Sequence, residues 1–327
     1  MSDPNTASIV STRPPTLPTE TGASASANAA PSESPRMEKT RGLLGDAWRD
    51  LRRKPLFWAS AALILLFVVM AAVPSLFTSG DAVNGDLARS LGTPSSEAWF
   101  GYDVQGRDVY SRVIYGARAS IVVALLSVLG TLLIGGAMGM MAGYRGGWVD
   151  SLLSRVADIF FGLPFVLGSI VILTTFNGSG SSNGKAEIMF LVIMSLTVLT
   201  WPVVMRLMRS SVLAAKEADY IVAARALGAG TGRIILKHLL PNCLAPLLVY
   251  GTIMVGSFIG AEATLSFLGI GLKSPVVSWG IMISEAQNYI RVSPFLLFFP
   301  SAFLVTAVLS FVMLGEAVRE ALDPKLR

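Results

Sequence analysis

The chain has 327 residues, of which 53% are hydrophobic and 14% are charged, and its mean hydropathy is +0.61. This composition excludes an ordinary soluble domain, and the net charge of +5 does not indicate nucleic-acid binding, because the basic residues flank apolar runs. One cysteine and one histidine exclude an internal disulfide and a Cys/His metal cluster, so we expect no metal site.

The N-terminal part of the chain divides into a polar tail and a basic segment. Residues 1–35 are rich in Ser, Thr, Pro and Ala. They hold too few large apolar side chains to offset the entropy of ordering, so we expect a disordered tail without a signal peptide. Residues 36–55 contain seven basic residues directly before the first apolar run, which predicts a cytoplasmic anchor.

Six apolar runs are long enough to cross a membrane as helices. They occupy residues 56–77, 119–144, 152–176, 188–208, 244–272 and 294–317. The chain is therefore predicted to be an all-α membrane protein with six transmembrane helices. We divide it into the tail, residues 36–118 with the anchor, first span and external segment, a five-span core at 119–317, and a C-terminal tail at 318–327.

The distribution of Lys and Arg predicts the orientation of these spans. With both termini in the cytoplasm, the cytoplasmic segments hold 18 Lys and Arg residues and the external segments hold 7. Because cytoplasmic loops carry the excess of positive charge in membrane proteins, this orientation is favoured.

The longest external segment, residues 78–118, carries a group of charged side chains before the second span. Its members are Asp103, Arg107, Asp108, Arg112 and Arg118. On physical grounds alone we favour surface ion pairs of little energetic value. The alternative is that Asp103, Arg107 and Asp108 form a docking face for an external protein.

Two acidic residues, Asp158 and Glu262, lie within apolar runs. A carboxylate at the centre of a bilayer costs about 2.5–3.5 kcal/mol on insertion scales, so both side chains should face protein or water. Asp158 lies near the start of its span, where a cap or a salt bridge explains it. Glu262 lies deeper among small residues, and we favour a structural hydrogen bond over a role in a substrate path.

A polar and basic loop, residues 210–242, separates the fourth and fifth apolar runs. Tyr220, Ala223, Ala224 and Leu227 recur in it at helical spacing. This pattern predicts a short helix over 216–227 with one shallow apolar stripe, shaped for a groove on a partner protein.

The residues after this helix predict a tight turn and a second helix. Gly228 follows the last periodic residue, where a left-handed C-cap favours glycine, and Thr231 is expected to cap the next helix. Pro241 should bend that second helix near the membrane surface, because proline removes one backbone donor.

The loop resembles the EAA loop of ABC-importer permeases. Its pattern Ala223-Ala224-x3-Gly228, followed by Leu240-Pro241, is similar to the family's pattern. Two positions differ: Val222 stands where the family has Glu, and His238 stands where it has Ile.

A second motif narrows the resemblance to the C-type permease subunits of oligopeptide, dipeptide and nickel importers. The segment FGYDVQGRDVYSRVIYGAR resembles their signature before the second span, with Tyr102 in place of Thr. The segments DAWRDLRRKPLFWAS, EATLSFLGIGLKSPVVSWGIMI and LGEAVREALDPKLR are also similar to these subunits. The resemblance covers about residues 45–327.

This resemblance implies a multi-pass permease of the type I ABC importer (MetI-like) fold in the cytoplasmic membrane. It implies as partners a second homologous permease, two ABC ATPase subunits or domains, an extracellular or periplasmic binding protein and membrane lipid, with no nucleic acid. The coupling contact to the ATPases would comprise Asp219, Tyr220, Ala223, Ala224, Arg225, Leu227, Gly228, Leu240 and Pro241.

Peptides are the cargo that the resemblance implies, with nickel or another small solute as an alternative under the same mechanism. A different class, a proton-coupled secondary transporter, would use Asp158 and Glu262. That class predicts paired broken helices in two inverted halves, which the sequence does not show.

ATP and magnesium are expected on the ATPase partners, so the chain itself is expected to bind no cofactor and to be no enzyme. The glycine-rich stretch at 178–186 does not form a phosphate-binding loop. Such a loop needs glycine five positions before the Gly-Lys pair and Ser or Thr after it, whereas position 179 is Ser and position 186 is Ala.

Overall fold

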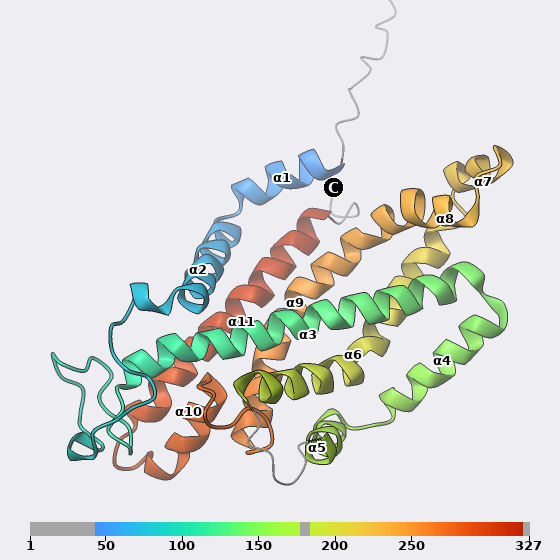
Figure 1. Ribbon diagram of the computed structural model, residues 1–327. Coiled ribbons are helices and arrows are strands. Elements are labelled where there is room, and N and C mark those ends of the chain that lie inside the picture. The colour runs from blue at the N-terminus through green and yellow to red at the C-terminus, as the bar shows by residue number, and fades with distance from the viewer. Residues whose placement is uncertain (1–42, 177–183, 323–327) are drawn as a thin grey trace, which may run out of the picture. The chain divides into compact units, whose positions relative to one another are not determined.

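The computed structural model describes residues 43–176 and 184–322, and every regular element in these ranges is helical (Figure 1). The helices are α1 (Leu43–Arg53), α2 (Pro55–Ala72), α3 (Val109–Arg145), α4 (Gly147–Phe161), α5 (Phe165–Phe176), α6 (Lys185–Ala215), α7 (Asp219–Ala226), α8 (Thr231–Ile234), α9 (Leu240–Phe267), α10 (Trp279–Ala286) and α11 (Phe295–Leu322). Short 3-10 turns lie at Pro74–Leu76, Leu87–Arg89 and Gln287–Tyr289, and a π-helical turn lies at Ile235–Leu239. The predicted tail at 1–35, most of the glycine-rich stretch and residues 323–327 lie outside the described residues.

Five helices of the described part of the chain are long and apolar enough to cross a membrane. They are α2, α3, α6, the continuous helix Thr231–Phe267 that ends with α9, and α11. The remaining predicted span, residues 152–176, is the third in chain order. It is not one helix but the pair α4 and α5, bent by 92°. The number of spans is therefore five, or six if the bent pair crosses as one.

The break between α4 and α5 has a local cause in the sequence Gly162-Leu163-Pro164. Pro164 has no backbone N–H to donate, and its ring disfavours the helical conformation at Leu163. Gly162 adds a residue of low helix propensity at the same point. The apolar composition of 152–176 predicted one continuous spanning helix, which is wrong, because the segment is interrupted at this point.

The helices α3 and α6 pack closely because α3 carries a glycine at every fourth position along one face. A Cβ atom built on Gly135 would lie 2.5 Å from the carbonyl oxygen of Trp201, and one on Gly139 would lie 2.4 Å from that of Met205. Small residues at this spacing allow two helix backbones to approach each other within a membrane. The pair α3 and α6 therefore forms a rigid centre for the remaining helices.

We expect Gly139→Ala to destabilise the protein by about 1–3 kcal/mol, because its methyl group would separate α3 from α6. The matched control is Gly260→Ala on α9, where no atom lies within 4 Å of the added Cβ. Thermal denaturation of the two variants in detergent measures the difference. Equal stability of both variants would contradict the close packing of α3 on α6.

Caps and buried side chains fix the start of α3 and the position of α10. The Asp108 carboxylate accepts hydrogen bonds from the backbone N–H groups of Tyr110 (3.3 Å) and Ser111 (2.9 Å), so it caps α3. The fully buried Trp279 of α10 donates its indole N–H to the carbonyl of Val113, at 2.9 Å. Figure 1 shows α10 near the N-terminal end of α3, and α7 near its opposite end.

Candidate functional site

Residues 219–242 form a hairpin, which we call the coupling hairpin, at the end of the molecule that carries α7. Its first arm is α7, and its second arm comprises α8, the π-helical turn and the start of α9. Ile221, Ile234 and Leu239 are buried and belong to the main apolar core. The hairpin is thus anchored to the main apolar core and is not a loose linker.

The predicted apolar stripe of the hairpin lies mostly on its surface. Tyr220 is 44% exposed and Leu227 is 89% exposed, and the side chain of Ala223 is exposed as well. Ala224 is only half-buried, since it turns partly toward the rest of the protein. Exposed apolar side chains on such a short helix provide a surface for another protein.

The remaining predicted members of the coupling contact divide into exposed and half-buried residues. Asp219, Arg225, Gly228 and Pro241 are exposed, whereas Leu240 is half-buried. The helix itself is shorter than the predicted range 216–227, because Ala218 adopts an extended conformation (φ −68°, ψ 144°) and α7 begins at Asp219. It has 8 residues.

The turn after α7 confirms the predicted left-handed glycine. Gly228 has φ +81°, its N–H donates to the carbonyl of Arg225, and the N–H of Ala229 donates to that of Ala224. This is the Schellman pattern of hydrogen bonds. The predicted cap at Thr231 is wrong: Gly230 holds the N-cap position of α8 without a side-chain hydrogen bond, and Thr231 is the first helical residue.

A π-helical turn lies directly before Pro241, where we predicted a bend, and the helix Thr231–Phe267 that contains both is continuous. The N–H of Leu240 donates to the carbonyl of Ile235, five residues back, and Pro241 has no N–H to continue the ladder. The amide of Asn242 donates to the carbonyl of His238 at 2.7 Å and to the hydroxyl of Tyr220 at 3.1 Å. Asn242 therefore joins the two arms, a role that the sequence did not reveal.

Two basic side chains attach the hairpin region to the C-terminal end of α3. The ammonium of Lys216 donates to the carbonyl of Gly143 at 3.2 Å. The guanidinium of Arg225 lies 5.9 Å from the ring centroid of Tyr144, within cation–π range. A force applied to the hairpin would therefore act on both α3 and α9.

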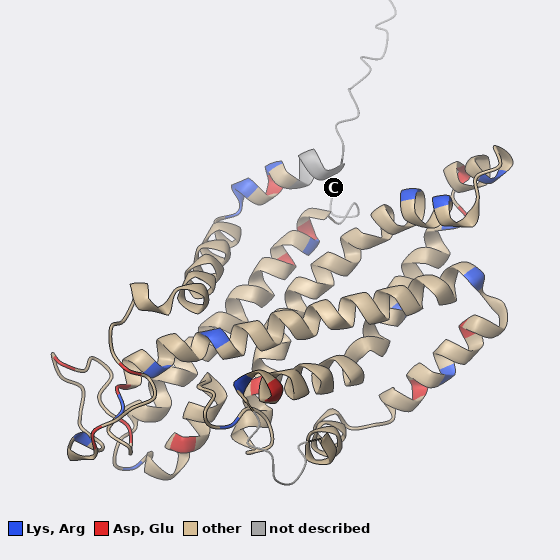
Figure 2. Cartoon of the chain, in the orientation of Figure 1, with Lys and Arg blue, Asp and Glu red and all other residues tan. Residues whose placement is uncertain are grey.

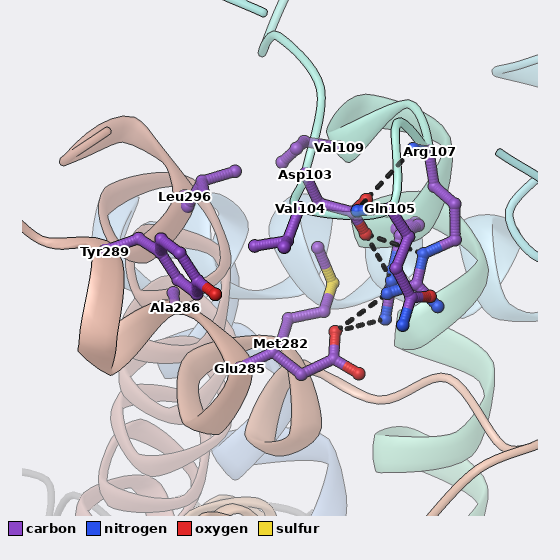
Figure 3. Close-up of a pocket in the computed structure, with 11 residues that line it drawn as sticks. Asp103, Val104, Gln105, Arg107, Val109, Met282, Glu285, Ala286, Tyr289 and Leu296 are labelled. Carbon is purple, nitrogen blue, oxygen red and sulfur yellow. Dashed lines mark hydrogen bonds and ion pairs between the residues drawn. The ribbon is translucent and has the colours of Figure 1, made fainter. Parts of the chain in front are cut away.

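A second candidate site lies at the opposite end of the long helices and centres on Asp103 (Figure 3). Oδ1 of Asp103 accepts hydrogen bonds from the backbone N–H groups of Gln105 (2.8 Å) and Arg107 (2.9 Å). Oδ2 accepts from Nε of Arg107 (2.7 Å) and Nη1 of Arg112 (2.5 Å). Four donors thus hold this carboxylate between two guanidinium groups.

Glu285 of α10 completes this group of residues, which we call the Asp103 cluster (Asp103, Arg107, Arg112 and Glu285). Its Oε2 accepts from Nη2 of Arg107 at 3.1 Å and from Nη2 of Arg112 at 2.9 Å. The Arg112 side chain is only 2% exposed, whereas that of Glu285 is 42% exposed. Burial raises the pKa of Glu285 above its ordinary value, with the charge of Asp103 acting in the same direction and that of Arg107 opposing it.

The Asp103 cluster borders a cavity of about 210 Å³. Its apolar wall includes Val104, Met282, Tyr289 and Leu296, and Figure 3 shows the carboxyl group of Glu285 between this wall and the guanidinium groups. Glu285 is the exposed charged group of the cluster. It lies 178 positions after Arg107 in the chain, so no local pattern could have identified it.

The charged residues grouped by the sequence thus serve different parts of the structure. Asp103 and Arg107 belong to the cluster, but their side chains are only 12% and 13% exposed. Asp108 caps α3 instead, as described above. Arg118 donates to the carbonyls of Ala71 and Ala72 at 2.8 Å and so satisfies the C-terminal end of α2.

The two acids that lie within apolar runs, Glu262 and Asp158, differ in their surroundings. Glu262 is fully buried, and its carboxyl accepts hydrogen bonds from the hydroxyls of Ser120 (2.8 Å), Ser266 (2.7 Å) and Ser278 (3.0 Å). Asp158 is half-exposed and accepts from the guanidinium of Arg206 at 2.5 Å. Glu262 thus has the hydrogen bonds, and Asp158 the salt bridge, that a structural role for each would require.

Comparison with family models identifies two regions of the chain. Residues 135–327 match the binding-protein-dependent transport system inner membrane component family. Residues 42–91 match the N-terminal TM domain of oligopeptide transport permease C.

Curated relatives extend these matches over most of the chain. The dipeptide transport system permease protein DppC of Bacillus subtilis is 38% identical over 283 residues, which are 86% of this chain and 86% of the relative. The oligopeptide transport system permease protein OppC of the same organism is 34% identical over 303 residues, 93% and 96% of the two chains. The glutathione transport system permease protein GsiD of Pectobacterium atrosepticum is 34% identical over 281 residues, 86% and 90% of the two chains.

A solved structure shares the fold. One chain of the MetNI methionine ABC transporter, in an inward-facing conformation, superposes with a TM-score of 0.52 at 21% identity over 64% of this chain and 96% of that chain. The superposition and the sequence matches point to the same family. The chain belongs to the family of inner membrane components of binding-protein-dependent transport systems, and it is a permease subunit with the MetI-like fold.

Proposed function

We propose that this chain is one of two homologous permease subunits of an ATP-driven importer that moves peptides into the cytoplasm. Peptides are favoured as cargo because relatives named for dipeptide, oligopeptide and glutathione transport match 86% or more of the chain. ATP and magnesium would bind on two separate ATPase subunits, and a binding protein would deliver the peptide from outside. Both termini would lie in the cytoplasm, as the distribution of Lys and Arg predicts.

The coupling hairpin is the observation that carries this proposal. It carries exposed apolar side chains, it is anchored to the main apolar core by Ile221, Ile234 and Leu239, and it continues directly into the spanning helix α9. In the proposed cycle, ATP binding draws the two ATPase subunits together and moves the seated α7. The rigid connection through Leu239 to α9 would transmit this movement into the membrane.

Reconstitution of the complete complex in proteoliposomes tests the proposal. We expect uptake of a radiolabelled dipeptide to require the binding protein and ATP inside the vesicles, and to persist when a protonophore removes the proton gradient. Uptake that needs the gradient but no ATP would contradict it. Uptake of nickel with no uptake of peptide would retain the ATP-driven mechanism and change the cargo.

We further propose that Glu285, as the exposed member of the Asp103 cluster, contacts a basic side chain of the binding protein. Glu285→Gln should then weaken binding-protein affinity several-fold at low ionic strength, because the charge is lost while the shape is kept. The matched control is Glu97→Gln, which removes the same charge from an exposed position outside the cluster. Surface plasmon resonance across a salt series measures the affinity of both variants. Equal losses of affinity would show that only the net charge of the surface matters and would contradict a specific contact at Glu285.

The raised pKa of Glu285 gives this contact a pH dependence with a defined sign. Protonation removes the negative charge, and a raised pKa makes this happen at a less acidic pH than for an ordinary glutamate. We therefore expect affinity to fall as the pH is lowered below neutral, and to do so at a less acidic pH than an ordinary glutamate would give. The fall should be absent in Glu285→Gln, and an unchanged pH profile in that variant would assign the dependence to another group.

A further inference from the structure

The helix α1 ends at the boundary of the membrane. It stops at Arg53, and Pro55 begins the first spanning helix α2, so one residue separates the two helices. That residue, Lys54, has an extended conformation (φ −90°, ψ 114°), and α1 is therefore not a continuation of the span. In the orientation of the proposed function, on which this inference rests, α1 lies at the cytoplasmic surface.

One face of α1 is held against the C-terminal end of α11. Leu51 is buried with Ala317 and Ala321 in a small apolar cluster of its own. Lys54 forms an ion pair with Glu320 of α11. Movement of α1 would therefore act on α11.

The exposed side chains described on the rest of α1 are basic or aromatic, whereas the acidic Asp50 is half-buried. Arg49, Arg52 and Arg53 are exposed, and no ion pair joins them to a side chain in the described part of the chain. Trp48 is 49% exposed and Trp58, at the start of α2, is 52% exposed. Figure 2 shows basic residues on α1 close to the point where α2 begins.

We infer that this surface binds the headgroups of anionic phospholipids in the inner leaflet. Guanidinium groups match phosphate in geometry, and half-exposed indole rings at the end of a span are typical of the interface between membrane and water. A basic residue near an anionic surface contributes about 1 kcal/mol, so three of them correspond to roughly a 100-fold preference for anionic over zwitterionic lipid.

A lipid occupant fits better than a protein because of the position of the surface. Arg52 and Arg53 lie three and two positions before Pro55, the first residue of the span, and therefore close to the depth of the lipid phosphates. Lipid bound there would hold α1 on α11 and so fix the cytoplasmic ends of α2 and α11. Lipid binding by α1 would thus be separate from the roles proposed for the coupling hairpin and the Asp103 cluster.

The test uses the purified complex with all its subunits in nanodiscs that contain phosphatidylcholine and a minor fraction of phosphatidylglycerol. Native mass spectrometry after partial delipidation counts the phosphatidylglycerol that remains bound. We expect the double variant Arg52→Gln/Arg53→Gln to retain it at least tenfold less strongly than the wild type. The control Arg145→Gln/Arg155→Gln removes the same charge from two exposed positions on different helices, α3 and α4, and it should lower lipid retention much less, because these two side chains do not form one site.

Equal retention by the two double variants would overturn the inference. Loss of the second permease or of an ATPase subunit in Arg52→Gln/Arg53→Gln, with lipid retention unchanged, would also overturn it, since the surface would then be a protein contact. The orientation is tested separately with Arg49→Cys in a Cys243→Ser background. Labelling of that cysteine from outside intact cells would contradict the proposed orientation. The lipid measurement does not involve transport, so it stands even if the proposed cargo is wrong.

Discussion

Replacing Ala223 by Trp is expected to release the ATPase subunits from the complex while the permease still folds. Ala223 is exposed on α7, so the indole ring can extend away from this chain and occupy the space of the proposed partner. Ala224, the other small residue of the pair, is a poorer test because it is half-buried and a large side chain there would also disturb the hairpin. We expect the affinity for the ATPase subunits to fall more than tenfold.

Gly228 provides a second and independent test of the same contact. Gly228→Val would place a branched side chain at φ +81°, a conformation that costs an L-residue about 1–2 kcal/mol and so favours a reoriented α7. The matched control is Gly232→Val, because neither added Cβ would meet an atom within 4 Å and only Gly228 has a positive φ. Any difference between the two variants therefore reports on the backbone of the turn.

Copurification of the ATPase subunits and the hydrolysis rate stimulated by loaded binding protein measure both changes. We expect Ala223→Trp and Gly228→Val to lose both signals and Gly232→Val to keep both. Insertion and pairing with the second permease serve as the folding control. Full ATPase content and normal stimulation in Ala223→Trp would remove the coupling role from the hairpin.

The local features of the hairpin were predictable because short-range chemistry decides them. The left-handed glycine at 228 follows from the end of a helical pattern, whereas the predicted bend at Pro241 did not anticipate a π-helical turn within a continuous helix. The prediction that Thr231 caps α8 was wrong for an equally local reason. Gly230 reached the extended N-cap conformation without a side chain, so a threonine hydroxyl one position later was not required.

The long-range partners were not predictable from the sequence. Glu285 contacts Arg107 and Arg112 only because the fold brings α10 to the start of α3. The residues Asp103, Arg107 and Asp108 are adjacent in sequence and look like one charged surface, yet the structure buries two of them in the cluster and uses the third as a helix cap. Composition likewise identified 152–176 as apolar but could not give the 92° bend.

Replacing Glu262 by Leu is expected to prevent assembly of the complex. The hydroxyls of Ser120, Ser266 and Ser278 all donate to the Glu262 carboxyl, and all three serines are buried. Leucine would remove the shared acceptor of these hydroxyls, at a cost of about 1–3 kcal/mol for each hydroxyl that finds no other acceptor. The loss would be structural because Ser278 is also the N-cap of α10 and Ser266 accepts the N–H of Leu272.

Glu262→Gln should retain most of the stability and uptake. The amide oxygen can take the position of Oε1, which accepts from Ser266 and Ser278. The amide NH2 group then replaces Oε2 and donates to Ser120, whose hydroxyl can turn toward a carbonyl of its own helix. Only the hydrogen bond with Ser120 would therefore change direction, and each group in the network would keep a partner.

Thr264→Leu is the matched control for the leucine variant. Thr264 is exposed on the same helix, and its hydroxyl donates only to the carbonyl of Gly260 at 2.8 Å. Size-exclusion chromatography in detergent should show an assembled complex for Glu262→Gln and Thr264→Leu and not for Glu262→Leu. If Glu262→Gln and Glu262→Leu both assembled normally and both lost uptake completely, the Glu262 charge would act on the cargo or on protons, and the hydrogen-bonded carboxyl would belong to the translocation path.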